Sequence, residues 1–403
     1  MSQQNITKED SVDLQTKQGL RVLMISTDRK MFEEGSAVRE RLIGYAQFLD
    51  RLDVIVFSTK EHGTPSGTIQ VSENIFLHAT NSANRWLYIQ DAVKLGKQVL
   101  KSTDSGLLTT DFVITTQDPF ETGWVGLNLS KKFHIPFHIQ IHTDFLSPYF
   151  AKSFLNKIRL HMASKTLPQA DGIRVVSQRI ANSLKAISYK LKATPKVLPI
   201  FIDAEMIENI PPTFDLKLKY PQFQKIILVA SRLEKEKDID TALVAFKEVS
   251  RHNPNTGLVI VGDGSEREAL ELKAKSYKLS ANVIFEGWQN DLNSYYKGAD
   301  VFLNTSFYEG YGMTLIEASL NKKPIVTTDV GIAGEGNLLL HTQHALVCPA
   351  GDSGCIAGYL NSFLKDLNGA RAMGLRAYTK IGGEVLGKDK YYKEIVGDWT
   401  KLF

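Results

Sequence analysis

The sequence predicts an α/β protein of two Rossmann-like domains, each with a doubly wound parallel sheet. Short apolar runs alternate with longer amphipathic stretches along most of the chain. Strands that are apolar on both faces are typical of parallel sheets covered by helices on both sides. The length of 403 residues fits about two to three domains, and 43% hydrophobic with 23% charged residues excludes a disordered, fibrous or collagen-like chain.

Two series of predicted strands are separated by the proline-bearing stretch 201–223. The first series is Arg21–Ser26, Asp53–Ser58, Ile75–Ala79, Phe112–Thr116, Phe137–His142, Gly172–Ser177 and Lys196–Ile200. The second series is Lys225–Ala230, Gly257–Val261, Val283–Phe285, Val301–Asn304, Pro324–Thr328 and Ala345–Cys348. We expect a disordered lead-in over 1–19, a first domain over 20–204, a second over 205–386, and a C-terminal helix over 387–403 that returns to the first domain. Ligands of such sheets bind at the carboxyl ends of strands, so the site is expected in a cleft between the domains.

The termini and cysteines predict a cytoplasmic protein that at most sits on a membrane surface, such as the inner face of the plasma membrane. The first residues lack the apolar core of a signal peptide, and no run approaches the ~18 apolar residues of a spanning helix. Cys348 and Cys355 have no metal-ligand spacing around them. They are interpreted as buried free thiols in a reducing compartment.

The strongest motif is Asn304–Ser319, in which a strand runs into a glycine-bearing loop and then a helix. Gly310 and Gly312 let the backbone approach a ligand, and the N-terminus of the helix favours an anion such as a diphosphate. Glu309 could accept hydrogen bonds from sugar hydroxyls, and Glu317 from the two hydroxyls of a ribose. The alternative is that Glu309 is a surface loop acid and Glu317 an ordinary helix residue.

A second motif, SRLEKEKD, follows the first strand of the second domain. Arg232 and Lys237 could grip a diphosphate leaving group as a divalent metal would; the alternative is a solvated charged turn. Gly262 begins a Gly-Asp-Gly triplet after the next strand, but Arg267 stands where a dinucleotide fingerprint has its third glycine. A tight strand-to-helix turn near the site is therefore favoured there.

Two residues of the first domain are also candidates. Gly35 precedes Ser36, which can cap the helix over Ser36–Leu49, and could let that helix approach a phosphate or sugar. His142 ends an apolar strand, where a polar group faces the site. His134 and His138 are expected to have structural or surface roles.

Together and in this order, these motifs resemble the retaining glycosyltransferases of family 4, which have the GT-B fold. The resemblance covers about residues 20–400 and rests on Glu309-x7-Glu317, on Arg232 with Lys237, on Gly-Asp-Gly after a strand and on His142. It implies an acceptor-side first domain and a nucleotide-sugar donor domain.

The resemblance implies a role for each matching position. Arg232 and Lys237 would bind the donor diphosphate, Glu309 the donor sugar, and Glu317 the ribose. The backbone near Phe285 and Trp288 would contact the base, and that of Gly312, Met313, Thr314 and Leu315 the phosphates. His142 would lie beside the transferred sugar, and Gly35 in the loop that closes over the phosphates.

Some positions depart from the family pattern. Glu33 and Glu34 precede Gly35 where paired glycines are usual, and Ser231 and Asp238 replace the glycines that usually flank the Arg and Lys. The implied reaction is a metal-independent hexosyl transfer with retention, by front-side attack, from a nucleoside diphosphate sugar. A UDP-sugar is the expected co-substrate, no other cofactor is expected, and polysaccharide biosynthesis is the expected setting.

Two other functions stay open. A nucleotide-sugar epimerase would share the fold and the nucleotide grip, and a non-catalytic nucleotide-sugar binder would share them without turnover. The glycine fingerprint expected of a nicotinamide dehydrogenase is incomplete.

The charge is concentrated in one block. Residues 151–200 hold ten Lys/Arg and one acidic residue, while the whole chain sums to only +4. A basic first domain suits an anionic glycan or lipid-linked acceptor. An amphipathic helix within residues 149–196 could contact an anionic membrane; the alternative is an aromatic core face with a solvated lysine rim. No motif supports nucleic acid binding.

Overall fold

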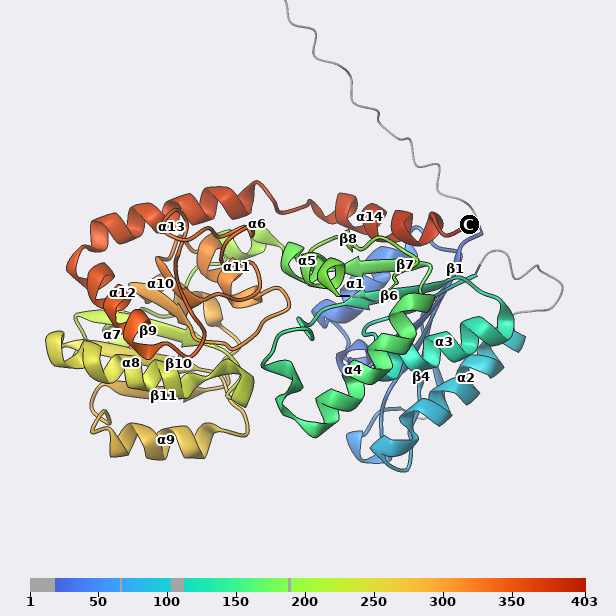
Figure 1. The fold of residues 1–403 in the computed structure, drawn as a ribbon, viewed down its shortest axis with the longest axis horizontal. Helices are drawn as coiled ribbons and strands as arrows, with labels where there is room; N and C mark the ends of the chain where they lie inside the picture. The colour runs from blue at the N-terminus through green and yellow to red at the C-terminus, as the bar shows by residue number, and fades with distance from the viewer. Residues whose placement is uncertain (1–18, 66, 103–111, 188–189) are drawn as a thin grey trace, which may run out of the picture. The chain divides into compact units, whose positions relative to one another are not determined.

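A computed structural model of the chain describes residues 19–65, 67–102, 112–187 and 190–403 (Figure 1). The expected lead-in lies outside the described residues except for Gly19. The α/β class is confirmed, because helices alternate with two separate, largely parallel sheets. None of the described helices is long and apolar enough to cross a bilayer.

The first sheet has the strand order β3-β4-β2-β1-β5-β6-β7-β8 among the described residues. Its strands are β1 (Arg21–Ser26), β2 (Arg51–Val56), β3 (Thr68–Ser72), β4 (Ile75–Ala79), β5 (Phe112–Thr116), β6 (Phe137–Ile141), β7 (Gly172–Val175) and β8 (Lys196–Val197). Its helices are α1 (Ala37–Ala46), α2 (Tyr88–Ser102), α3 (Glu121–Phe133), α4 (Phe154–Thr166) and α5 (Gln178–Ala186). As predicted, Ser36 caps α1, and its Oγ accepts from the backbone N–H of Arg39 at 3.2 Å.

This sheet differs from the prediction at several strand ends and in one added strand. β6 ends at Ile141, so His142 follows the strand instead of ending it. The strands β2, β7 and β8 also end earlier than predicted, at Val56, Val175 and Val197.

β2 begins two residues early because its start is polar: the buried Asp53 carboxylate accepts from Arg51 at 2.7 Å and lies 2.9 Å from His78. β3 was not predicted, since it is a largely polar strand that pairs antiparallel with β4 at the edge of the sheet. An edge strand needs no continuous apolar run.

The second sheet has the order β11-β10-β9-β12-β13-β14 among the described residues. Its strands are β9 (Lys225–Ala230), β10 (Thr256–Val261), β11 (Val283–Gly287), β12 (Val301–Asn304), β13 (Ile325–Thr328) and β14 (Leu346–Cys348). The helices of this region are α6 (Ala204–Asn209), α7 (Leu216–Lys219), α8 (Ile239–His252), α9 (Arg267–Ser276), α10 (Leu292–Gly298), α11 (Met313–Leu320), α12 (Ser353–Lys365) and α13 (Leu367–Gly382). The strand order reverses between β9 and β12, and such a switch point is where ligands of doubly wound sheets bind.

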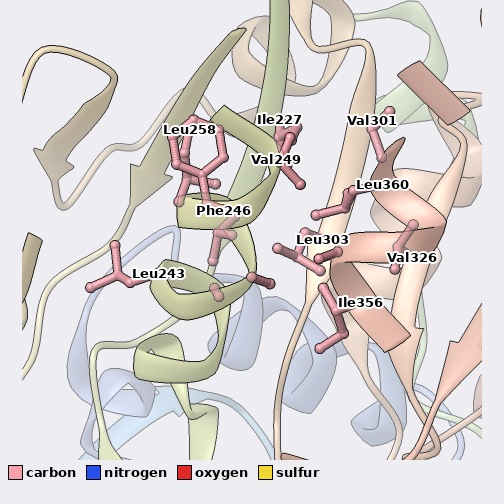
Figure 2. Packing of buried hydrophobic residues seen from close by; sticks show 14 of the residues in the cluster. Ile227, Leu243, Phe246, Val249, Leu258, Val301, Leu303, Val326, Ile356 and Leu360 are labelled. Carbon is pink, nitrogen blue, oxygen red and sulfur yellow. The ribbon is translucent and has the colours of Figure 1, made fainter. Parts of the chain in front are cut away.

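The core of the second sheet lies under α8 and α12 (Figure 2). Phe246 and Leu243 of α8 and Leu360 of α12 lie among buried residues of the strands, including Leu303 and Val326. These side chains recur at helical spacing, which is why this part of the sequence forms helices that cover one face of the sheet.

The C-terminal helix α14 (Lys388–Thr400) packs on elements of the first sheet, as predicted. Its Tyr392 and Trp399 rings contact Tyr45 of α1 edge-on, at centroid distances of 5.5 and 5.8 Å. Its Asp398 lies 3.1 Å from His138, which also contacts Thr115 and is buried. The structural role expected for His138 is therefore confirmed.

The described chain forms two compact units. One contains the chain up to Ile139, the short segment Gln169–Gly172, and Asp389–Phe403. The other contains Gln140–Pro168 and Ile173–Lys388, and so includes the segments that follow β6 and β7 together with the second sheet. The boundary predicted at residues 204 and 205 stays a prediction.

The expectation of two free thiols is wrong. Cys348 and Cys355 form a disulfide, with 5.9 Å between their Cα atoms. Cys348 ends β14 and Cys355 lies in the first turn of α12, so the short connection brings the Cα atoms to a distance that a disulfide spans. A spacing of seven residues does not by itself predict a disulfide, because the pairing depends on how the chain turns between β14 and α12.

Candidate functional site

The loops after β9 and β12 meet at the switch point of the second sheet. Lys237 Nζ lies 2.6 Å from Glu309 Oε1, and Ser306 Oγ donates to the same oxygen at 2.8 Å. The two charged side chains are only 13% and 15% exposed. The Thr305 hydroxyl donates to the Lys237 carbonyl at 3.0 Å, which fastens one loop to the other. The predicted Lys237 and Glu309 are thus brought together as a shielded ion pair.

Arg232 is placed differently from Lys237, although both come from the same turn. Its side chain is 62% exposed and pairs with Glu236 at 2.9 Å. The backbone N–H of Phe307 donates to the carbonyl of Glu236 at 2.8 Å, so this turn also contacts the loop of Glu309. The contact with Glu236 uses only Nη2 of Arg232, so the other N–H donors of its exposed guanidinium are open to a ligand.

The departures from the family pattern have a local explanation. Asp238, where glycine is usual, has the left-handed conformation (φ 48°) that glycine adopts most readily. Gly262 has φ 133°, and a Cβ there would lie 1.8 Å from the carbonyl oxygen of Ser231. The Gly-Asp-Gly triplet is therefore the predicted strand-to-helix turn, and it packs directly on the Arg232 turn.

The helix α11 begins at the end of the Glu309 loop. Its N-cap is Gly312, at φ 90°, which has no side chain to accept hydrogen bonds from the backbone N–H groups of the first turn. Met313 and Thr314 are half-buried in that turn, while Leu315 is buried. The N-terminus of α11 keeps the positive end of its dipole beside Glu309, as an anion site requires.

Glu317 is held inside this unit, one turn further along α11. The Tyr296 hydroxyl donates to Glu317 Oε2 at 2.9 Å. Burial raises the pKa of Glu317, and the hydrogen bond from Tyr296 opposes that rise. Phe285 of β11 is half-buried, whereas Trp288 is largely exposed and its Nε1 donates to Asn290 at 3.3 Å.

The end of β6 lies against the loop of Glu309 in the same compact unit. A Cβ on Gly310 would lie 1.8 Å from the carbonyl oxygen of His142 and 3.1 Å from the Cα atom of Thr143. The buried Ser177 hydroxyl, which precedes α5, donates to the carbonyl of Gly310 at 2.8 Å. His142 is therefore brought to Gly310 by its backbone, and its imidazole is half-buried.

Three residues of this region were not predicted. Ser177 is one, and Arg179 is another: it bonds the carboxylate of Asp329 and the carbonyls of Gly331 at 3.2 Å and Ala333 at 2.6 Å. Gly331 in turn lies close to Glu309: a Cβ placed on Gly331 would be 3.1 Å from the Cβ of Glu309. Arg179 and Asp329 are 150 residues apart, so nothing in a single sequence could pair them.

The third is Asp144, two residues after His142. Its Oδ1 is buried and has no hydrogen-bond partner in the structure of the described residues. Burial raises the pKa of Asp144, while the charge of Arg179 lowers it. A buried acceptor without a partner is costly, and a hydroxyl donor from a substrate would satisfy it.

Gly35 lies in the first compact unit. Its φ of 71° suits glycine, and it stands in the connection from β1 to α1. The order of the first sheet reverses between β1 and β5, so this connection leaves from a switch point as well. The role of Gly35 at the donor phosphates stays a prediction.

One sizeable cavity, about 820 Å³, lies in the first compact unit at the opposite ends of the strands. It is lined by residues at the starts of β1, β2 and β4, among them Arg21, Arg51 and Ile75. Because ligands of parallel sheets bind at carboxyl ends, we do not assign this cavity to the site. Within the described ranges, no group of three or more His, Cys, Asp or Glu residues is arranged to hold a metal ion.

Glu317→Gln should separate stability from binding. The raised pKa means that the carboxyl favours the folded state below its unfolded pKa, and that this contribution is lost as pH rises through the folded pKa. The variant should therefore melt like the wild type in acid and gain relative stability towards neutral pH. Its affinity for a uridine nucleotide should fall about tenfold, because a charged acceptor of ribose hydroxyls is lost.

Thermal melts across pH and calorimetry with UDP measure both effects. Glu268→Gln, on an exposed part of α9, is the control and should change neither. A Glu317→Gln protein that binds UDP as tightly as the wild type would contradict the role of Glu317 at the ribose.

Residues 213–380, which carry most of these groups, match the family described as "Glycosyl transferases group 1". Curated relatives include the alpha-monoglucosyldiacylglycerol synthases of Streptococcus pneumoniae (28% identical over 227 residues) and Acholeplasma laidlawii (26% over 233 residues). The matches cover 53% of this chain, and 51% and 58% of these relatives. The chain thus spans about half the length of the curated relatives it matches.

Solved structures match over nearly the whole chain. Sucrose-phosphate synthase from Thermosynechococcus elongatus gives a TM-score of 0.76 at 20% identity, covering 95% of this chain and 99% of that one. HepE from Anabaena, in complex with UDP-glucose, gives 0.72 at 18% identity, covering 95% and 100%. At these identities the likeness to the solved structures establishes the fold alone. The segment 213–380 is similar to the group 1 glycosyl transferases, and the chain as a whole has the GT-B fold.

Proposed function

We propose that the protein is a retaining glycosyltransferase that moves a hexose from a UDP-sugar to a hydroxyl of a lipid-linked or cell-surface glycan acceptor. The observation that carries the proposal is the shielded Lys237–Glu309 pair at the switch point of the second sheet, beside the N-terminus of α11. The relatives named as glycolipid synthases and the HepE complex with UDP-glucose support the choice of acceptor and donor.

In this reaction the bond from the anomeric carbon to the diphosphate oxygen breaks, and a bond from that carbon to the acceptor oxygen forms on the same face. The acceptor proton passes to an oxygen of the departing diphosphate. Lys237, helped by Arg232, stabilises the negative charge that develops on the diphosphate. Backbone N–H groups of Gly312–Leu315 would add to this stabilisation.

The remaining groups position the substrates. Glu309 holds hydroxyls of the transferred sugar, and Lys237 and Ser306 fix its carboxylate for that task. His142 lies beside the sugar, Glu317 holds the ribose, and the backbone near Phe285 and Trp288 meets the base. Holding both substrates in one geometry removes most of the entropy cost of their encounter.

Calorimetry against a panel of UDP-, GDP- and ADP-sugars tests donor choice, with UDP-hexoses expected to bind most tightly. Transfer is then measured on lipid-linked and water-soluble acceptors, with and without EDTA. We expect release of UDP and a glycosylated acceptor in both conditions. Isomerised nucleotide sugar without UDP release would favour an epimerase, and binding without any turnover would favour a non-catalytic binder.

A further inference from the structure

The first two turns of α4 expose an apolar stripe. Phe154 is 80% exposed, and Leu155 and Ile158 are each 43% exposed. They are spaced i, i+1 and i+4, so they lie on one side of the helix. We call Phe154, Leu155 and Ile158, together with the exposed Lys152 and Lys157, the α4 surface. Apolar side chains gathered at one place on a surface mark an interaction site.

The α4 surface lies in a segment whose charged residues are all basic. The segment from Tyr149 to Thr166 contains four Lys/Arg and no acidic residue. Ser153 caps α4, accepting from the backbone N–H of Asn156 at 3.1 Å, so the positive end of the helix dipole lies beside Lys152 and Lys157. Cations at that end disfavour an isolated helix, and an anion near it would relieve the repulsion.

The structure also shows that not every basic residue of the block 151–200 belongs to an open surface. Arg174 is buried and donates to Gln140 at 2.6 Å and to the carbonyls of Leu198 and Pro199. Arg179 bonds the Asp329 loop. Neither belongs to an open basic surface, so the block is not one uniform stripe, and the α4 surface is where cations and exposed apolar groups coincide.

Aromatic contacts connect the α4 surface to the loop of Glu309 within one compact unit. The Tyr149 ring stacks on Phe307 with centroids 4.7 Å apart, and Lys152 Nζ lies 4.5 Å and 5.1 Å from the two centroids. Phe150 meets Tyr308 edge-on at 5.8 Å. Phe307 and Tyr308 directly precede Glu309. An acceptor headgroup held at the α4 surface would therefore be close to the loop that holds the donor sugar.

A comparable apolar residue elsewhere lacks the charge. Leu218 of α7 is 79% exposed and also stands between two lysines. However, Lys217 pairs with Asp300, and Lys219 pairs with Glu286 at 2.6 Å. Its cations are neutralised, which makes Leu218 a matched control for the apolar part of the α4 surface.

We propose that the α4 surface binds anionic lipid bilayers, with Phe154, Leu155 and Ile158 entering the interface and Lys152 and Lys157 meeting lipid phosphates. Partly buried apolar side chains and cations facing anionic headgroups are the two contributions that hold interfacial helices. This inference deepens the proposed function and rests on it: if the acceptor is lipid-linked, binding to the bilayer would bring the enzyme to its acceptor.

Vesicle co-sedimentation with the full chain tests the proposal. Vesicles of phosphatidylcholine alone are compared with vesicles containing 30% phosphatidylglycerol, a composition of about one anionic lipid in three that gives a substantial surface potential. The wild type should bind the anionic vesicles at least tenfold more tightly, and added salt should weaken binding. Equal binding to both kinds of vesicle, or to neither, would overturn the proposal.

Variants assign the binding to its residues. We expect binding to weaken about 100-fold in the apolar triple variant, Phe154→Ser/Leu155→Ser/Ile158→Ser. In the charge variant, Lys152→Glu/Lys157→Glu, a loss of about fivefold for each lysine gives about 25-fold or more. Leu218→Ser and Lys131→Glu/Lys132→Glu, which change exposed residues elsewhere, should bind as the wild type does. Variants of the α4 surface that bind normally, or controls that lose binding equally, would overturn it.

Two control measurements show whether a loss of vesicle binding comes from misfolding or from a change in nucleotide-sugar binding. Circular dichroism and melting temperature should be unchanged in the apolar triple variant, since its side chains are exposed. Calorimetry with the UDP-sugar should also be unchanged in that variant. A wild-type protein that binds vesicles but no nucleotide sugar would refute the proposed function alone, whereas the reverse result would refute only the membrane contact.

Discussion

Lys237→Met should lower kcat for sugar transfer by about 10²–10³-fold, the loss expected when one preorganised donor to developing negative charge is removed. Methionine keeps the apolar stem of lysine and most of its length but removes its charge. Lys237 is the better shielded of the two predicted cations, with 13% of its side chain exposed against 62% for Arg232. A shielded charge is weakened less by water and salt, so Lys237 should matter more than Arg232.

The Lys237–Glu309 ion pair complicates this variant, because Lys237→Met leaves Glu309 with the Ser306 hydroxyl alone among the described contacts to its Oε1. We therefore expect some loss of stability as well, of about 1–3 kcal/mol. Lys237→Met/Glu309→Gln should recover part of that stability and none of the activity. Lys235→Met, an exposed lysine in the same turn, is the control and should keep the wild-type kcat. A Lys237→Met enzyme with normal turnover would refute its assigned role.

Gly310→Ala should destabilise the protein by about 3 kcal/mol or more and abolish transfer. The added Cβ would lie 1.8 Å from the carbonyl oxygen of His142, far inside contact distance. The obstacle is backbone, which cannot rotate away as a side chain would, so the Glu309 loop or the end of β6 must shift. Either shift would also strain the hydrogen bond from Ser177 to the Gly310 carbonyl.

A matched substitution separates this clash from the general effect of replacing a glycine. A Cβ on Gly358, which is exposed in α12, would meet no atom within 4 Å. Gly358→Ala should stabilise the protein by about 0.5–1 kcal/mol, because alanine is the better helix former. Melting temperature and kcat measured side by side would decide the matter. A Gly310→Ala enzyme as stable and active as the wild type would show that the two segments do not touch in solution.

The second sheet was predictable because its strands are buried on both faces. β9 and β12 begin and end where their apolar runs do, and their carboxyl ends carry the Lys237 and Glu309 loops. Once the two strands are neighbours at a switch point, the meeting of these residues follows. Polar elements were harder: β3 has no apolar run, and β2 starts at Arg51 because Arg51 and His78 satisfy a buried Asp53.

Contacts between distant segments were beyond the sequence. Ser177 supports the Glu309 loop and Arg179 the Asp329 loop, each from a segment more than 130 residues away. Spacing alone also did not show that Arg232 is exposed whereas Lys237 is shielded. The same is true of the disulfide, which depends on how β14 turns into α12. Residue type and spacing identify groups capable of a given chemistry, whereas three-dimensional contacts decide which of them act together.

The configuration of the product tests the central claim most directly. The enzyme would be incubated with the UDP-α-hexose that binds most tightly and its acceptor, and the anomeric coupling constant of the product would be read by NMR. We predict an α-linked product, one UDP released for each sugar transferred, and loss of both with Lys237→Met. A β-linked product, or a new nucleotide sugar formed without release of UDP, would contradict the account.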